Sequence, residues 1–215
     1  MRFTMVAVTC AVLAIGVGAA AAKDLNPPPW DASLPHQTAQ AWECQTSSGF
    51  FNVEPTVSQN PYGFAYMNVM GGDAIQVIPG PDGQPIPTWH IGPGGGGIDI
   101  WVPNNPDENL VKRIFWQLTS DKSPTPTGSP PTTNPPGTAL PAPYPQSQWP
   151  TDNWYTYNGL LEIRPNPVGE WIHFNFAEST NIEEIVIKTV CVVPEPATLS
   201  LLAVGALAVM RRRRR

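Results

Sequence analysis

Apolar and polar residues alternate with a period of two over most of the chain between residues 42 and 192. Ile172, Phe174 and Phe176 fall on one face of an extended segment, and the residues between them fall on the other. The same alternation, or a short apolar run bounded by Gly, Pro or Asn, predicts strands at 42–46, 50–53, 63–70, 74–78, 89–91, 98–102, 113–118, 160–164 and 184–191. No long segment has helical periodicity. The pattern therefore predicts an all-β fold, an antiparallel β-sandwich with a jelly-roll-like arrangement, over residues 42–192.

Glycine and proline mark the connections between these strands. Gly71-Gly72-Asp73 predicts a hairpin turn, and the glycines at 94–97 predict a flexible hairpin loop. Residues 123–150 hold ten prolines in 28 positions and predict a long loop of the same domain, with an O-glycosylated patch or a linker between half-domains as alternatives. Residues 23–41 predict an irregular lead-in.

The N-terminus has the pattern of a secretory signal peptide. Arg2 precedes an apolar stretch at 6–17, and Ala20-Ala21-Ala22 supplies small residues for cleavage before Lys23. Residues 1–22 are therefore expected to be removed on export, the alternative being a retained N-terminal membrane helix.

The C-terminus has three parts. Val193-Pro194-Glu195-Pro196 is followed by an apolar run at 197–210 and then by a basic cluster, Arg211, Arg212, Arg213, Arg214 and Arg215. A helix over the 14 apolar residues measures about 21 Å, short of the roughly 30 Å hydrocarbon core, and adding the preceding residues brings it close to a span. We expect a membrane helix at about 196–210, with the arginines in the cytoplasm and the domain outside.

This tail resembles the PEP-CTERM sorting signal, and the resemblance is limited to residues 193–215. It implies recognition and processing by an exosortase-type membrane enzyme, after passage through the export machinery. It also implies a protein that is anchored at first and then resides in the cell envelope or outside the cell. The alternative is a plain membrane anchor that is never cut.

The net charge of the exported part limits the kinds of partner that it can bind. Of the 12 Lys and Arg residues Arg2 and the terminal five are lost, and of the 17 Asp and Glu residues Glu195 is lost. The remaining 6 basic and 16 acidic residues give a net charge of −10. Such a surface argues against nucleic acid and anionic lipid as partners and is compatible with neutral envelope polysaccharide, with divalent cations or simply with solubility.

The cysteines predict one disulfide. Cys10 leaves with the signal peptide, so Cys44 and Cys191 remain as an even pair in an oxidising compartment. Their bond would join the first and last predicted strands; the alternative is two buried free thiols.

Chemistry-bearing motifs are scarce, and the sequence contains no nucleophile elbow, phosphate loop, His-Glu-x-x-His or Cys-x-x-Cys. No catalytic residue, metal ligand set or cofactor is therefore predicted. The three histidines are scattered, and residues 104–109 describe either an ordinary polar turn or a calcium loop. Carboxylates for glycoside hydrolysis are available, but no pair is singled out by the sequence. They are Asp99, Glu162, Glu170, Glu178, Glu183 and Glu184.

Aromatic residues give the remaining functional hint. Trp149, Asp152, Trp154 and Tyr157 cluster after the proline-rich segment, where rings could stack on sugars and polar groups could bond hydroxyls. Alternatively, these rings pack the proline-rich loop onto the sandwich. We therefore expect an exported, non-catalytic cell-envelope or extracellular-matrix protein. The alternatives are a carbohydrate-binding module and, after it, a glycoside hydrolase.

Overall fold

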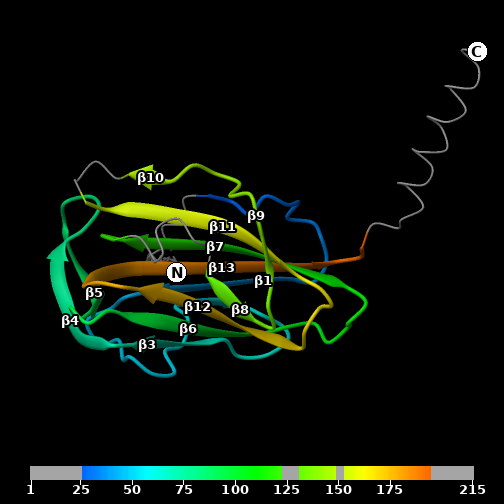
Figure 1. Cartoon of the computed structure of the whole chain (residues 1–215), viewed down its shortest axis with the longest axis horizontal. Helices are drawn as coiled ribbons and strands as arrows, with labels where there is room; N and C mark the ends of the chain where they lie inside the picture. The colour runs from blue at the N-terminus through cyan, green and yellow to red at the C-terminus, as the bar shows by residue number, and fades with distance from the viewer. Residues whose placement is uncertain (1–25, 123–130, 149–152, 195–215) are drawn as a thin grey trace, which may run out of the picture.

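Thirteen strands and no helix form the described part of the chain, which in this computed structural model comprises residues 26–122, 131–148 and 153–194 (Figure 1). The predicted signal peptide, the end of the sorting tail and its membrane helix lie outside these residues. Within them, no helix is long and apolar enough to cross a membrane. The strands are β1 (Gln37–Glu43), β2 (Val57–Gln59), β3 (Tyr66–Met70), β4 (Gly72–Pro79), β5 (Pro85–Ile91), β6 (Gly96–Pro103), β7 (Val111–Ser120), β8 (Thr132–Asn134), β9 (Thr138–Leu140), β10 (Ser147–Gln148), β11 (Tyr155–Ile163), β12 (Gly169–Phe176) and β13 (Thr180–Val192).

The strands form two antiparallel sheets of unequal width, so the all-β, antiparallel prediction is confirmed. The larger sheet runs in the order β10-β11-β7-β13-β1-β2, with β9 paired to β11 and the β4–β5 hairpin attached to β13 through β5. The smaller sheet has the order β3-β6-β12-β8. In Figure 1 the axes of the central strands of both sheets are nearly aligned across the molecule, and β4 and β5 lie at one end.

The core lies between the two sheets, as the alternation predicts. From the smaller sheet Ile172, Phe174 and Phe176 are at most 3% exposed, while the intervening residues of β12 point outward. From the larger sheet Ile114 and Ile187 are fully buried in the same cluster. Removal of this apolar surface from water is the main stabilising term of the sandwich.

At two glycine turns the chain crosses from one sheet to the other. Neither turn closes a hairpin, so the predictions of a hairpin turn at 71–73 and a hairpin loop at 94–97 are wrong. Gly71 links β3 in the smaller sheet to β4 in the larger one, and Gly95 links β5 back to β6. Both glycines have a φ of 74°. A Cβ on Gly71 would lie 2.7 Å from the carbonyl oxygen of Gly95, so the two crossings touch. Glycine is needed there for the left-handed backbone and for the close approach.

The first predicted strand begins earlier than expected. β1 starts at Gln37, inside the predicted lead-in, because its inward residues Thr38 and Gln40 are buried but polar and so hide the alternation. The predicted strand at 50–53 is reduced to an isolated bridge between Val53 and Met67.

The described part of the proline-rich segment, residues 131–148, contains three short strands. β8 extends the smaller sheet through β12, whereas β9 and β10 both pair with β11 of the larger sheet. Tyr144 also packs edge-on against Phe115, with ring centroids 6.1 Å apart. Proline is tolerated around such short peripheral strands, which need few ladder hydrogen bonds.

The predicted disulfide is wrong, because both Cys44 and Cys191 are buried free thiols. Their strands are indeed neighbours, but β1 and β13 are antiparallel. The amide of Cys44 bonds the carbonyl of Glu183, and the amide of Cys191 bonds the carbonyl of His36. Eight residues of β13 separate the two positions, about 26 Å along an extended strand, whereas a disulfide needs Cα atoms within about 7 Å.

Candidate functional site

The sorting tail begins where the central strand of the larger sheet ends. β13 stops at Val192, and Val193 is 75% exposed. Val193 and Pro194 are the described residues of the predicted motif. Glu195, Pro196 and the basic cluster from Arg211 to Arg215 lie outside the described residues.

The aromatic cluster predicted after the proline-rich segment is divided. Trp149 and Asp152 lie outside the described residues. Trp154 is 4% exposed and donates its indole N–H to the carbonyl oxygen of Pro79 at 3.0 Å. Tyr157 is half-buried and packs against the core. Trp154 is therefore a packing residue, which agrees with the packing alternative and leaves its ring little surface for a sugar.

A different set of aromatic rings lies on the outer face of the smaller sheet. Tyr66 of β3, Trp101 of β6 and Trp171 of β12 stand opposite one another in register, and we call these three the aromatic ladder. The ring centroids of Tyr66 and Trp171 are 5.6 Å apart at 85°, and those of Trp101 and Trp171 are 5.5 Å apart at 51°. All three side chains are partly exposed. The ladder thus presents apolar ring surface across three adjacent strands.

Polar side chains form the next row of the same face. Asn68, Asp99 and His173 occupy successive register positions on β3, β6 and β12. His173 Nδ1 lies 2.7 Å from Asp99 Oδ1, and the His173 ring stacks on Trp171 at 6.3 Å and 15°. His173 is therefore paired with Asp99 of the neighbouring strand. Aromatic rings beside fixed donors and acceptors are the mixture that a sugar-binding surface uses.

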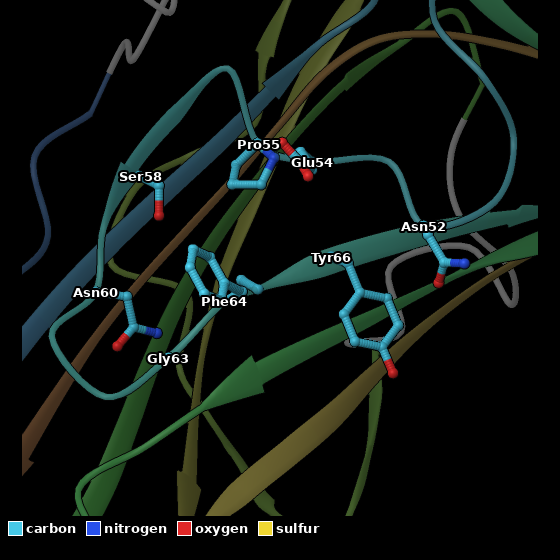
Figure 2. Close-up of a pocket in the computed structure, with 9 residues that line it drawn as sticks. Asn52, Glu54, Pro55, Ser58, Asn60, Gly63, Phe64 and Tyr66 are labelled. Carbon is cyan, nitrogen blue, oxygen red and sulfur yellow. The ribbon is translucent and has the colours of Figure 1, made fainter.

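A cavity of about 690 Å³ adjoins the ladder at the edge of β3 (Figure 2). Tyr66 belongs both to its lining and to the ladder, and Phe64, which also lines it, is 94% exposed. The polar groups of the lining come from Asn52, Glu54, Ser58 and Asn60. The outer face of the smaller sheet therefore continues from the aromatic ladder into a hollow with carboxylate and amide groups.

The candidate carboxylates are spread over different parts of the fold. Asp99 is on the outer face of the smaller sheet, and Glu170 is fully buried inside the sandwich. Glu162 is on β11, where Arg164 Nε at 2.7 Å and Arg113 Nε at 3.0 Å contact its carboxylate. Burial opposes ionisation of Glu162, but hydrogen bonds from the two arginines outweigh it and lower its pKa.

The oxygens of the loop at 104–109 are largely used within the loop itself. Asn105 Oδ1 accepts the amide of Asp107, and Asp107 Oδ1 accepts the amide of Asn109. Asn104 Oδ1 accepts a hydrogen bond from Lys112 Nζ at 2.7 Å. These contacts are those of a polar turn. Among the residues that the structure describes, no three His, Cys, Asp or Glu side chains gather into a metal-binding group.

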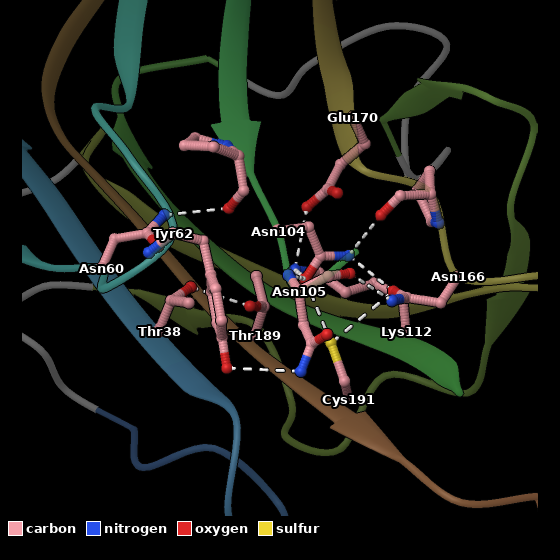
Figure 3. A network of polar contacts seen from close by, with 12 residues as sticks. Thr38, Asn60, Tyr62, Asn104, Asn105, Lys112, Asn166, Glu170, Thr189 and Cys191 are labelled. Carbon is pink, nitrogen blue, oxygen red and sulfur yellow. Dashed lines mark hydrogen bonds and ion pairs between the residues drawn. The ribbon is translucent and has the colours of Figure 1, made fainter. Parts of the chain in front are cut away.

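A second polar cluster is enclosed at the end of the sandwich where β6, β7 and β12 meet (Figure 3). Lys112 and Glu170 are both 0% exposed, and their Nζ and Oε1 atoms are 3.3 Å apart. Asn104, Asn166 and Cys191 surround the lysine and are all at most 4% exposed. Burial raises the pKa of Glu170, against the attraction of Lys112, which lowers it.

Sequence reasoning missed both the aromatic ladder and the buried cluster of Lys112 and Glu170. Alternation placed Trp171 and His173 on an outer face, but it carried no information about which residues of β3 and β6 stand opposite. Lys112 and Glu170 interrupt apolar patterns at inward positions, and that interruption is the one available signal for the buried cluster.

The fold and the outer face define an all-β, two-sheet domain with an aromatic surface. Comparison with known proteins adds where such a protein is sorted. The PEP-CTERM protein-sorting motif matches residues 192–215, so the resemblance of the tail is confirmed. No curated protein matches the chain. The motif marks a protein that is exported, sorted to the envelope or cell surface and processed by an exosortase.

Proposed function

We propose that the chain is a non-catalytic envelope or extracellular-matrix protein whose β domain binds polysaccharide on the outer face of the smaller sheet. The aromatic ladder is the single observation that carries the binding role. Its three rings span adjacent strands, so they could contact successive sugar units of a chain laid across the sheet.

The surroundings of the ladder support a neutral sugar as ligand. The Asp99–His173 pair lies one row away and could bond hydroxyl groups. The exported part carries a net charge of −10, which disfavours strongly anionic polymers. The cavity beside Tyr66 could take a branch or the end of the glycan chain.

Absence of catalysis is part of the proposal. A glycosidase needs two carboxylates about 5 to 9 Å apart across one cleft. Asp99, Glu162 and Glu170 belong instead to an outer face, an arginine-bound surface position and the buried interior. The domain is therefore expected to bind glycans without hydrolysing them, and release of reducing ends would contradict this.

The remaining features of the proposal concern export and processing. Residues 1–22 act as a signal peptide, the helix at about 196–210 holds the chain in the membrane before processing, and cleavage falls near Pro194–Pro196. The intact mass of the protein from exporting cells is expected to lack both ends. A mass that retains the five arginines would mean a plain anchor.

The binding role is tested by affinity electrophoresis through gels containing hydroxyethylcellulose, xylan or exopolysaccharide extracted from the exporting cells. We expect Trp101→Ala and Trp171→Ala each to weaken binding by about 2 kcal/mol, roughly a 30-fold increase in Kd, as for buried aromatic anchors.

Tyr144→Ala is the matched control, because Tyr144 is a partly buried ring that packs edge-on against Phe115 of the larger sheet, away from the ladder. It should leave binding unchanged. Folded Trp101 and Trp171 variants that bind as tightly as the parent protein would exclude the ladder as the site.

A further inference from the structure

The buried cluster at the end of the sandwich contains an amine, a carboxamide and a carboxyl group in contact. Lys112 Nζ lies 2.7 Å from Asn104 Oδ1 and 3.3 Å from Glu170 Oε1. Lys112 and Glu170 are 0% exposed and Asn104 is 4% exposed, so water has little access to any of the three. Figure 3 shows the three side chains converging from separate elements.

The carboxyl group is placed to exchange a proton with the amine. Apart from Lys112, no donor in the described residues reaches either oxygen of Glu170. Burial raises the pKa of Glu170, which favours its protonated form. Two charges are costly to bury. In an interior without water, the neutral pair of amine and carboxylic acid therefore competes with the charged pair of ammonium and carboxylate. The neutral amine is the form of lysine that acts as a nucleophile.

The carboxamide of Asn104 is held and polarised. Besides Lys112, its Oδ1 accepts the backbone amide of Asn105 at 2.9 Å and the thiol of Cys191 at 3.0 Å. Its Nδ2 donates to Asn166 Oδ1 at 2.5 Å and to the carbonyl oxygen of Pro167 at 2.9 Å. Two fixed donors on the oxygen would stabilise the negative charge that develops there when an amine adds to the carbon.

We propose that Lys112 and Asn104 condense to an intramolecular amide that joins the ends of β6 and β7. The bond between Lys112 Nζ and Asn104 Cγ forms, and the bond between Asn104 Cγ and Nδ2 breaks. Starting from the neutral amine and the protonated acid, Glu170 gives its proton to Nδ2, which departs as ammonia, and takes one proton from Nζ, so the carboxyl group ends in the form in which it began. No atom changes oxidation state, and no oxidant or other reactant is consumed.

The proximity of the groups suits such a reaction, since fixed neighbours in a dry site react as if at very high concentration. Asn104 is the electrophile in preference to Asn166, because Asn104 Oδ1 contacts the lysine. The Nδ2 of Asn166 instead bonds the carbonyl oxygens of Asn105 and Asp107. The product would tie β6 of the smaller sheet to β7 of the larger one in a protein whose Cys44 and Cys191 are unpaired.

Residues Asp107 and Glu108 lie between the two partners and make a decisive digest possible. The denatured protein from exporting cells is cleaved at these acidic residues and analysed by mass spectrometry. We expect the fragments carrying Asn104 and Lys112 to remain joined, with a mass about 17 Da below that of the two fragments together, the mass of one ammonia. Two separate fragments would overturn the proposal. A loss of ammonia confined to the Asn104 fragment would also overturn it, because a cyclised asparagine joins nothing.

Two variants distinguish the loss of the proton carrier Glu170 from a general disturbance of the loop. Glu170→Gln keeps the size of the side chain but cannot carry the proton, so the joined fragment should disappear. Asn109→Ala changes an exposed residue of the same loop and should leave the joined fragment in place. A folded Glu170→Gln protein with full cross-linking would refute the proton-carrier role, while the digest of the parent protein tests the bond whether or not the variant folds.

Discussion

The two cysteines provide the sharpest test of the strand register, because the register is what separates them. Unfolding of the protein without residues 1–22, and so without Cys10, in a denaturant without reductant should expose two free thiols, one from Cys44 and one from Cys191. A disulfide between them is geometrically excluded by the antiparallel pairing of β1 and β13. Addition of a reductant should therefore leave both the thiol count and the midpoint of unfolding unchanged.

The magnitude of the native protection follows from the environment of the thiols. Burial raises the pKa of Cys44 to about 12 against an opposing hydrogen bond from Ser48, and burial also raises the pKa of Cys191. At pH 8 a thiol with a pKa of about 12 is roughly one part in 10,000 thiolate, against about a quarter for an ordinary cysteine. Ionisation alone should thus slow the reaction of Cys44 with a disulfide reagent by roughly 2,000-fold in the native state.

The assay is titration of thiols with a chromogenic disulfide at pH 8, before and after unfolding. A native protein that reacts slowly and an unfolded one that yields two thiols would agree with the structure. An unfolded, unreduced protein that yields none would refute the register between β1 and β13. A Cys44→Ser variant, which should yield one thiol, controls for incomplete reaction.

Two further predictions concern the larger sheet. Gly159→Ala should destabilise the domain by about 1 to 3 kcal/mol in urea unfolding, because the added Cβ would lie 2.7 Å from the indole of Trp116; an unchanged midpoint would contradict this packing. Glu162→Gln should cost about 0.2 to 1 kcal/mol at pH 7, since the arginine contacts of Arg113 and Arg164 are partly exposed. The pKa of Glu162 is lowered on folding, so its contribution exists above the ordinary carboxyl range and is lost as the pH falls through the folded value. The two proteins should therefore converge in stability near pH 2, and a constant difference would argue against an electrostatic origin.

Alternation predicted strands well where the inward residues are apolar. The strand containing Ile172, Phe174 and Phe176 was predicted correctly because each inward position is a large hydrophobe. The beginning of β1 was missed because Thr38 and Gln40 occupy inward positions. Thr38 hydrogen-bonds Thr189, two residues before Cys191 of the buried cluster, so the pattern failed next to the part of the core that is polar.

The glycan-binding prediction shows a second limit. The sequence grouped Trp154 and Tyr157 because they are close along the chain, yet their backbone positions turn both side chains toward packing contacts. The exposed rings Tyr66, Trp101 and Trp171 lie far apart in the sequence and meet through the pairing of β3, β6 and β12. Composition indicated that aromatic surface was available, and pairing decided which rings provide it.

The sequence by itself determined the all-β class, the faces of most strands and the sorting tail. These are local properties, since the side-chain period of a strand and the succession of motif, apolar run and arginines depend on neighbours along the chain. The tertiary structure alone decided the position of each strand beside its partners. Pairing register is a long-range property fixed by the packing of whole faces. It therefore took three-dimensional structure to separate Cys44 from Cys191, to align the aromatic ladder and to bring Lys112 against Asn104 and Glu170.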